Sequence, residues 1–544
     1  MTRDFSKHLS IHISRDLLNR SSFASQVISN IQLPDRQFPK SVFIHDDNQI
    51  CLGYYVSYED TFTDEQIFLL CKNNQWHNLV NKIADYLIIF IDCINHRINI
   101  LISQSGKFPC YYSLEDDQIV ISTSFHLVDK NLKKRTLNTE DALEFLSWGQ
   151  GLYPREETLF KQIRQLPPAT LLTINSNFTV TVKPLFQIEE ILENVSGSPF
   201  LNIEDFKKEL LTVGKTVVAS NLKSLGNLEF SSDISSGFDS SLVTYWLKKT
   251  STQPFTCFSM YSPLIYEDSN PEIVDKFCKF HELTNKFVDI SNQFPFVNLT
   301  NPEYAKHGFY ITDYGFEKLI YGYNLLSNSG KKEIGLFTGH GGDEWYYYST
   351  LENTLRYGVQ SSYFNSIKFV KSWLNLILTT KGVDILLDKK RFLQKRIYPS
   401  PVFSSVFSLG QMYFPLFWES GVWPLTPFSD PRLTDLGRRM PKNLLNEEKI
   451  KFKLWSPEDG IFVKEQFTPK SGPEKLDNRY ITEKVDLVIS ILKKSVLGEL
   501  GLIKNTELIK ELETKNLSYI ANDDVLLDLQ ALIQLEIFLQ KSDL

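Results

Sequence analysis

Residues 1–192 alternate short apolar runs with turn residues, at intervals of about ten residues. This spacing predicts the strands of a packed, β-rich domain. The clearest runs are Ser41–His45, Ile50–Val56, Leu87–Cys93, Ile98–Ser103 and Gln118–Thr123. One amphipathic helix is predicted over Thr139–Trp148, with Thr139 as its N-cap. A small, polar stretch at Glu193–Pro199 is typical of a linker and predicts a domain boundary there.

The pattern changes at Asn202, where longer helical periods begin to alternate with short apolar strands. Such alternation predicts a parallel sheet with crossover helices. The predicted helices are Glu204–Ser220, Ser240–Lys249 and Ile273–His281, and the predicted strands are Leu228–Ile234, Pro254–Tyr261, Lys286–Ile290 and Gly335–Thr338. The remainder is predicted to be largely helical. We therefore expect an α/β chain with two domains, 1–192 and 202–544.

Composition narrows the class of protein. The chain has 544 residues, 42% hydrophobic and 23% charged, as in an ordinary globular protein. A net charge of -7 argues against nucleic acid as a partner. Six cysteines without a CxxC pair predict buried, reduced thiols in a cytoplasmic protein. The start has no apolar core of a signal peptide, and the most apolar run, Tyr86–Ile94, is too short to span a membrane and contains Asp92.

The segment Ser232–Ser241 (SDISSGFDSS) lies between a predicted strand and a predicted helix. A strand that turns into a helix through small residues directs backbone N–H groups and the helix dipole at one point, which favours a phosphate. A carboxylate at Asp239 would repel phosphate unless Mg²⁺ lies between them. The alternative is a helix capped by serines, with Asp239 in its first turn.

A second segment, Leu336–Glu344 (LFTGHGGDE), also follows a predicted strand. Its glycines allow the backbone to approach a ligand closely. Asp343 and Glu344 supply carboxylates, and His340 supplies a group that can titrate near neutral pH. The alternative is an ordinary solvent-exposed turn.

Together the two segments resemble the synthetase half of the asparagine synthetase family, a group of ATP-dependent amide ligases that also contains β-lactam synthetases and lasso peptide cyclases. Ser235–Ser240 resembles the family loop S-G-G-x-D-S, with Ser236 in place of the first glycine. Thr338–Glu344 resembles the second loop, S-G-x-G-x-D-E, and Pro427–Asp430 resembles P-F-L-D. In the N-terminal part, Ser105–Tyr112 and Glu157–Pro168 resemble the amidotransferase domain of the family. The resemblance spans residues 100–475.

The resemblance implies an N-terminal Ntn-hydrolase-like αββα domain, here a degenerate glutaminase, and a C-terminal PP-loop ATP pyrophosphatase domain of the adenine nucleotide α-hydrolase type. It implies that a substrate carboxylate attacks the α-phosphate of ATP and that an amine then displaces AMP to form an amide. Mg²⁺ would be held by Asp239 and Asp343. The residues implied to contact the nucleotide are Ile234, Ser235, Ser236, Gly237, Asp239, Ser240, Phe258, Met260, Thr338 and Gly339.

Two catalytic residues follow from the resemblance. His340 stands where relatives carry Glu or Tyr, and imidazole is a competent base for deprotonating the attacking amine. The alternative is a loop histidine bonded to backbone. Lys470 follows Lys451 at the spacing of a family lysine that would stabilise charge on the reacting phosphorus. Lys464 is the rival for this role.

A glutaminase of this family needs a cysteine directly after Met1, but Thr2 stands there and the first cysteine is Cys51. We therefore expect no glutaminase activity, so that the amine comes from the substrate. The resemblance then implies ring closure, with macrolactam formation on a lasso peptide as the first expectation and a precursor-processing protease as a partner.

Three alternatives stay open: an ammonia-dependent asparagine synthetase, a β-lactam-type synthetase, and a non-catalytic nucleotide-binding scaffold. The polar run Ser231–Asp233 in a strand that is usually apolar, together with Ser236, favours the scaffold. The presence of both Asp239 and Asp343 argues against such decay.

Overall fold

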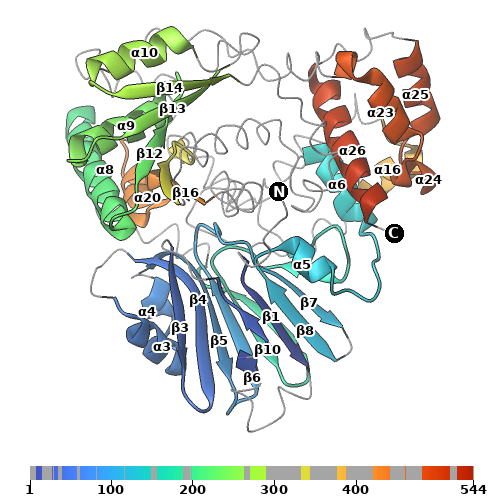
Figure 1. The fold of residues 1–544 in the computed structure, drawn as a ribbon, viewed down its shortest axis with the longest axis horizontal. Helices are drawn as coiled ribbons and strands as arrows, with labels where there is room; N and C mark the ends of the chain where they lie inside the picture. Colours follow the sequence, from blue (N-terminus) through green and yellow to red (C-terminus); the bar gives the residue numbers. More distant parts are fainter. Residues whose placement is uncertain are drawn as a thin grey trace.

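The computed structural model contains two antiparallel sheets, one parallel sheet and flanking helices (Figure 1). It describes residues 8–14, 27–28, 30–34, 39–57, 62–80, 83–115, 117–148, 156–187, 197, 199–261, 270–289, 333–342, 377–386, 421–441, 460, 481–514 and 523–542. The mixed α/β class predicted from the sequence is confirmed, including the combination of antiparallel and parallel sheets.

The two antiparallel sheets pack face to face and form the N-terminal sandwich. The first sheet has the order β2-β1-β8-β7-β9 and the second has the order β11-β10-β6-β5-β4-β3. The first comprises β1 (Ser10–Ser14), β2 (Ile31–Gln32), β7 (Tyr111–Glu115), β8 (Gln118–Ser122) and β9 (Ile163–Gln165). The second comprises β3 (Lys40–His45), β4 (Gln49–Ser57), β5 (Ile83–Asp92), β6 (Arg97–Ile102), β10 (Thr170–Asn175) and β11 (Val180–Pro184).

Strand alternation produces four layers, helix–sheet–sheet–helix. In β4, Leu52 and Tyr54 face the interior between the sheets, whereas Cys51 and Tyr55 face outward and pack with helix residues. The helices α3 (Asp64–Lys72) and α4 (Trp76–Val80) cover the outer face of the second sheet. The helices α5 (Phe125–Asp129) and α6 (Thr139–Trp148) cover the outer face of the first.

The parallel sheet has the order β14-β13-β12-β15-β16. Its strands are β12 (Phe230–Asp233), β13 (Thr256–Tyr261), β14 (Thr284–Asp289), β15 (Ile334–Phe337) and β16 (Val422–Leu425). Strands β13 and β14 are added on one side of β12, whereas β15 and β16 lie on its other side, so the strand order reverses between β12 and β15. This reversal determines where the candidate site lies.

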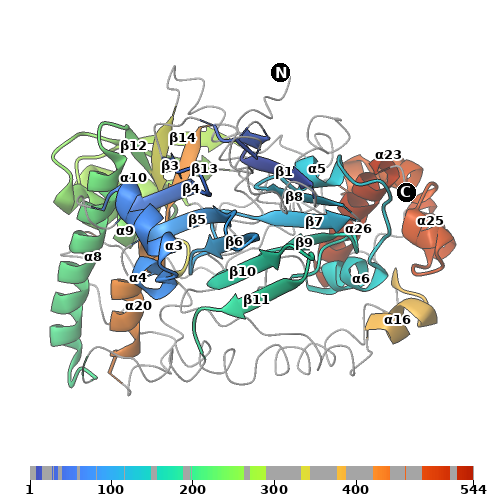
Figure 2. The ribbon, with the colours of Figure 1, turned by 90° about the horizontal axis from the view of Figure 1, so that it is seen from below.

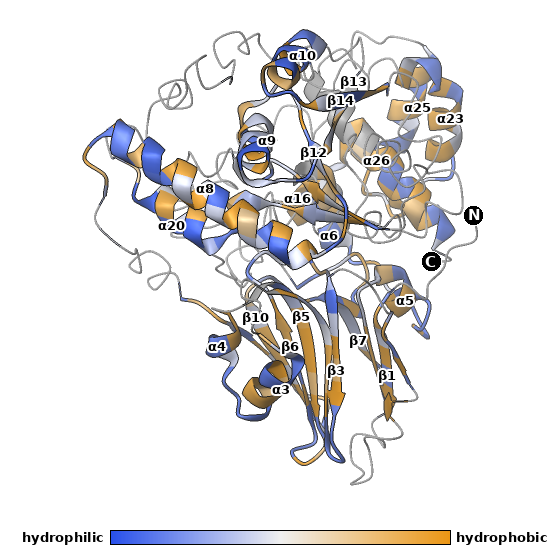
Figure 3. Ribbon diagram, turned by 60° about the vertical axis from the view of Figure 1, so that its left-hand side comes forward, coloured by the Kyte–Doolittle hydropathy of each residue, from blue (hydrophilic) through white to orange (hydrophobic). Residues whose placement is uncertain are grey.

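Helices flank the parallel sheet, and their amphipathic pattern explains their places. They are α8 (Ile203–Leu225), α9 (Phe238–Thr250), α10 (Pro271–Phe280), the short 3-10 helix η4 (Pro427–Ser429) and α20 (Pro431–Arg438). α8 shows one apolar and one polar face along its length (Figure 3). Trp246 of α9 packs on Phe428 of η4, with ring centroids 5.5 Å apart, and both side chains are buried.

The C-terminal helices pack on the N-terminal sandwich. They are α16 (Thr380–Leu386), α23 (Val485–Leu492), α24 (Val496–Glu499), α25 (Asn505–Glu513) and α26 (Asp523–Lys541). One apolar cluster joins α26 to α6 and to the outer face of the first sheet (Figure 2). Within it, Phe538 lies 5.9 Å from Phe160, measured between ring centroids. The last helices thus share a core with residues that precede them by several hundred positions.

Most predicted elements are present with shifted ends. The helix predicted over Thr139–Trp148 has these bounds, but Thr139 is wrong as the N-cap. The helix begins at Thr139, so Asn138 occupies the capping position, and its carbonyl accepts from the Ala142 N–H at 3.0 Å. The expectation of a largely helical remainder missed β16, where Pro424 stands inside the strand. Most of the predicted linker 193–199 lies outside the described residues.

All six cysteines are buried and free, as predicted. Tyr86–Ile94 contributes to β5, where Tyr86–Ile91 are buried on both faces of the sheet. Among the helices that the structure describes, none is long and apolar enough to cross a bilayer. The division into domains 1–192 and 202–544 stays a prediction.

A buried ion pair shapes the segment that leads from the sandwich toward the parallel sheet. Lys107 Nζ lies 2.9 Å from Asp85 Oδ2, and the Ser105 hydroxyl donates to Asp85 Oδ1 at 2.5 Å. Lys107 and Asp85 are 2% and 6% exposed. Phe108, the residue after Lys107, lies between Tyr54 of the sandwich and Trp423 of β16. Its ring centroid is 5.9 Å from that of Tyr54 and 4.9 Å from that of Trp423. The ion pair therefore fixes a contact between the two sheet systems.

Replacing Asp85 by Ala is expected to lower the free energy of unfolding by about 3–5 kcal/mol, because the charge of Lys107 stays buried without its partner. The matched control is Glu513→Ala, since Glu513 pairs with Lys493 at 3.4 Å but both side chains are more than half exposed. That change should cost less than about 1 kcal/mol. Urea titration of both variants tests this, and equal losses would contradict the structural role of the buried pair.

Candidate functional site

The two loops singled out from the sequence follow neighbouring strands. Ser232 of β12 pairs with Phe337 of β15, and the loops begin just beyond these residues. Both loops therefore lie at the carboxyl end of the parallel sheet, on either side of the point where the strand order reverses. Open α/β sheets bind their ligands outside the carboxyl ends of the strands, at the point where the strand order reverses.

The loops touch each other through glycine. A Cβ on Gly339 would lie 2.5 Å from the backbone nitrogen of Ser240, and a Cβ on Gly342 would lie 2.4 Å from the carboxyl carbon of Asp239. Neither distance can accommodate a side chain without movement. The structure thus brings Gly339 and Gly342 of the second loop against Asp239 and Ser240 of the first.

Hydrogen bonds among serines and backbone hold the first loop. The Ser235 N–H donates to Ser240 Oγ at 3.1 Å, and the two hydroxyls lie 2.9 Å apart. The Gly237 N–H donates to Ser235 Oγ at 3.1 Å. The N-cap of α9 is Gly237, which offers no side chain, so the serine cap of the alternative is wrong, whereas Asp239 does lie in the first turn of the helix as the alternative states. The N-terminus of a 13-residue helix therefore meets this loop without a side-chain cap.

Serine at position 236 is compatible with the loop. Within the described residues, Ser236 is not among those with a positive φ, so its Cβ carries no left-handed strain. Its side chain is 7% exposed, and its Oγ accepts from the Asn270 N–H at 3.4 Å, which links the loop to the start of α10. The departure from the family motif at Ser236 therefore does not by itself argue for decay.

The carboxylates of the site fit a hard cation such as Mg²⁺. The Asp239 carboxyl lies directly against Gly342, and Asp343 is the next residue in the chain. Carboxylate oxygens of these two residues would be the donors that Mg²⁺ prefers. In the part of the chain that the structure describes, no three His, Cys, Asp or Glu residues cluster as a metal site. Asp343 itself lies outside the described residues.

His340 is half-buried in the second loop, and its Nδ1 lies 3.1 Å from the Thr338 hydroxyl. The alternative of a histidine bonded to backbone is thus replaced by a side-chain partner. Burial lowers the pKa of His340 to about 4, with a smaller contribution from the positive charge of Lys107. The imidazole is therefore neutral at physiological pH, the form that can accept a proton.

A polar residue that the motif comparison left without a role lies at the end of β12. Asp233 pairs in register with Phe258 of β13, which pairs in turn with Lys286 of β14. Burial raises the pKa of Asp233 to about 6. The sequence signal was the polar run Ser231–Asp233 in a strand that was expected to be apolar. Ser232 bonds to Thr244 of α9 at 2.8 Å, so it serves the packing of that helix.

Other predicted site residues fall into two groups. The Ile234 N–H donates to the Phe258 carbonyl at 2.9 Å, and the Thr338 N–H donates to the Leu425 carbonyl at 2.9 Å. Ile234 and Thr338 therefore lie where the strands end and the loops begin. Lys470, Lys464 and the side chain of Met260 lie outside the described residues. Their predicted roles stay predictions.

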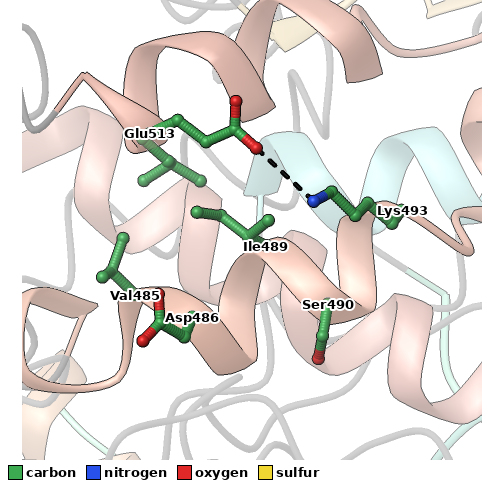
Figure 4. A pocket seen from close by; sticks show the side chains of 7 residues that line it. Val485, Asp486, Ile489, Ser490, Lys493 and Glu513 are labelled. Atoms are coloured by element: carbon green, nitrogen blue, oxygen red, sulfur yellow. Dashed lines mark ion pairs between the residues drawn. The ribbon is translucent and has the colours of Figure 1, made fainter.

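A pocket of about 360 Å³ lies away from these loops, between α23 and α25 (Figure 4). Ile489 and Leu512 supply apolar walls, and Lys493 pairs with Glu513 at 3.4 Å across the rim. Figures 1 and 2 both place these helices on the opposite side of the molecule from β12. The pocket contains none of the residues predicted from the sequence.

Comparison with known proteins gives little support for any assignment. No protein-family model matches the chain, and no curated protein matches it. Among solved structures, an allosteric regulatory enzyme of purine biosynthesis aligns at 10% identity and a TM-score of 0.18, covering 46% of this chain and 62% of that one. A glutamine phosphoribosylpyrophosphate amidotransferase from B. subtilis, complexed with ADP and GMP, aligns at 9% identity and a TM-score of 0.19. That alignment covers 64% of this chain and 73% of the other. Similarity at this level carries no argument about the site.

Proposed function

We propose that the chain is an ATP-dependent amide ligase that adenylates a substrate carboxylate and lets an amine attack it. The observation that carries the proposal is the contact of the two loops at the reversal point of the parallel sheet, with Asp239 between them. The N-terminal sandwich, with its four layers, is compatible with the proposed degenerate glutaminase domain. The peptide substrate and the ring closure rest on the sequence resemblance alone.

The first loop is suited to the β- and γ-phosphates. The N-terminus of α9 supplies backbone N–H groups and the positive end of its dipole, while Ser235 and Ser240 supply hydroxyls that are already held in place. A rigid set of donors needs little reorganisation when charge develops on the leaving pyrophosphate. The α-phosphate would then lie toward the second loop, where the substrate carboxylate approaches.

In the first step, a carboxylate oxygen bonds to the α-phosphorus and the bond to the bridging oxygen of pyrophosphate breaks. Mg²⁺, held by Asp239 and Asp343, would supply charge neutralisation on the phosphate oxygens. The chain's own task is to orient the phosphates and to exclude water from the acyl-adenylate. The buried surroundings of both loops serve this exclusion.

In the second step, the amine nitrogen bonds to the acyl carbon, AMP leaves and one proton is released. His340 is in the neutral form over the physiological range because burial holds its pKa at about 4. The Thr338 hydroxyl fixes the orientation of the ring, so that one nitrogen can accept the proton of the amine. The low pKa makes the imidazole a weaker base than an exposed histidine, but it keeps the accepting form fully populated.

Replacing His340 by Ala is expected to slow amide formation by about 100-fold, the typical contribution of a general base. Pyrophosphate release in the first turnover should change little, because His340 has no proposed role in adenylation. In the wild type, protonation of His340 should not reduce the rate of amide formation until the pH falls below about 5, since its pKa is about 4. Quenched-flow measurement of pyrophosphate and AMP separates the two steps, and an equal loss of both would reject the base role.

The activity itself is tested by pyrophosphate release from ATP and Mg²⁺ with candidate substrates. Release with aspartate and ammonium but not with peptides would support the asparagine synthetase alternative. Release with a small amino-carboxylate that closes its own ring would support the β-lactam type. ATP binding without pyrophosphate release from any carboxylate would favour the nucleotide-binding scaffold.

A further inference from the structure

We infer that Asp233 determines nucleotide specificity by accepting hydrogen bonds from the ribose hydroxyls of the bound nucleotide. The inference rests on the proposed ATP site and adds to it a residue that discriminates ribonucleotides from deoxyribonucleotides.

The position of Asp233 follows from strand register. Asp233 pairs with Phe258, and its preceding neighbour Ser232 pairs with Phe337, the last residue of β15. Asp233 is therefore the last strand residue of β12, between the strand that leads to the second loop and the strand that carries Phe258. Paired neighbours in a sheet present their side chains on the same face, so Asp233 and Phe258 share one surface.

Within the part of the chain that the structure describes, the carboxylate of Asp233 has no compensating group. Among the described residues it has neither an ion-pair nor a hydrogen-bond partner, and burial is what raises its pKa. The neighbouring cation, Lys286, instead lies over the ring of Phe258 at 5.9 Å. An uncompensated carboxylate in partly buried surroundings destabilises the fold, which is the pattern of a residue kept for a ligand. The side chain keeps some exposed surface, so a ligand can reach it.

The chemical group that Asp233 would bind is identified by the residues on either side of Asp233. The phosphate loop begins at Ser235, two residues beyond Asp233, and Phe258 lies beside Asp233 on the next strand. A nucleotide with its phosphates in the loop and its base along Phe258 must lay its ribose across the end of β12. Ribose hydroxyls are hydrogen-bond donors, and a carboxylate is the acceptor that nucleotide-binding sheets use for them.

The test measures equilibrium binding of ATP, 2′-deoxy-ATP and 3′-deoxy-ATP to the full chain in the presence of Mg²⁺, by calorimetry. The wild type should bind ATP about 10- to 100-fold more tightly than at least one deoxy analogue, because a hydrogen bond to a charged group is lost. A site that is built to pair with a hydroxyl leaves its own polar group unpaired when that hydroxyl is absent.

Asp233→Leu should remove this preference by lowering the affinity for ATP to that for the deoxy analogue. Asp233→Asn, which keeps one acceptor oxygen, should retain part of it. Asp289→Asn is the matched control, since Asp289 ends β14 at the same edge of the sheet but two strands away. This control should keep the preference of the wild type.

The outcomes separate this inference from the proposed function. If ATP binds but the wild type does not distinguish it from either analogue, the ribose contact is wrong while the nucleotide site stands. The same holds if Asp233→Leu keeps the preference. If no nucleotide binds, the proposed function fails and the ribose contact fails with it.

Discussion

Replacing Asp239 by Asn is expected to reduce ATP-dependent pyrophosphate release by at least about 1000-fold. The change keeps the size of the side chain but removes one charge from the pair that would hold Mg²⁺, so charge on the leaving pyrophosphate loses its main compensation. Asp239 lies where the two loops touch. Steady-state pyrophosphate release at saturating ATP measures the effect.

The fold should survive this substitution. Asn has the shape of Asp and gives up only the favourable interaction of the carboxylate with the N-terminus of α9, so the melting temperature should fall by no more than a few degrees, about 1 kcal/mol of stability. Asp275→Asn is the control, because Asp275 lies within α10, which flanks the same sheet, and belongs to neither loop. Its pyrophosphate release should match that of the wild type. Full activity in both Asp239→Asn and Asp343→Asn would show that the metal assignment is wrong.

Replacing Gly342 by Ala is expected to reduce pyrophosphate release by about 100-fold. The new Cβ would lie 2.4 Å from the Asp239 carboxyl carbon, so the two loops must move apart by about 1 Å to relieve the contact. A displacement of this size misplaces the carboxylate relative to the phosphates, and misalignment of about 1 Å costs about 100-fold in rate. The chemistry of every other side chain is unchanged.

A glycine remote from the loops gives the control for this second substitution. Gly226 ends α8 with a φ of +61°, and a Cβ there meets nothing within 4 Å. Gly226→Ala should therefore cost about 1 kcal/mol of stability through its left-handed backbone, with pyrophosphate release unchanged. If pyrophosphate release by Gly342→Ala equals that of Gly226→Ala, the contact between the loops is not needed for activity.

The sequence predicted elements well where periodicity is strong. The apolar runs of the sandwich correspond to real strands because both faces of those strands are covered, as in β5, where Leu87 and Ile88 enter different cores. The sequence-based prediction failed where a single residue determines where a helix begins or whether a strand forms. Thr139 and Asn138 are both good capping residues, and their order along the chain does not reveal which backbone is already helical. Pro424 disfavoured a strand, yet β16 is an edge strand of the sheet, where proline is tolerated.

In the candidate site, too, the sequence predicts some features and not others. Strand–turn–helix patterns placed both loops at strand ends, and parallel strands necessarily bring their carboxyl ends to one edge. The contact between Gly342 and Asp239 depends on which strands are neighbours, and the sequence does not specify strand order. The shifts in the pKa of Asp233 and His340 arise chiefly from burial, and the positive charge of Lys107, distant in the sequence, lowers the pKa of His340 further. Such effects become visible only once the chain is folded.

The packing of α26 against α6 has a consequence for how the chain could be divided. The final helix buries Leu532 and Leu535 in a cluster that also contains Leu143 and Phe160 from the sandwich side. A fragment that starts at residue 202 would leave this cluster without about a third of its buried members. It would expose the apolar side chains of α26 to water, so it should aggregate rather than fold alone. The sandwich would thus be required for the C-terminal helices to fold, whether or not it binds glutamine.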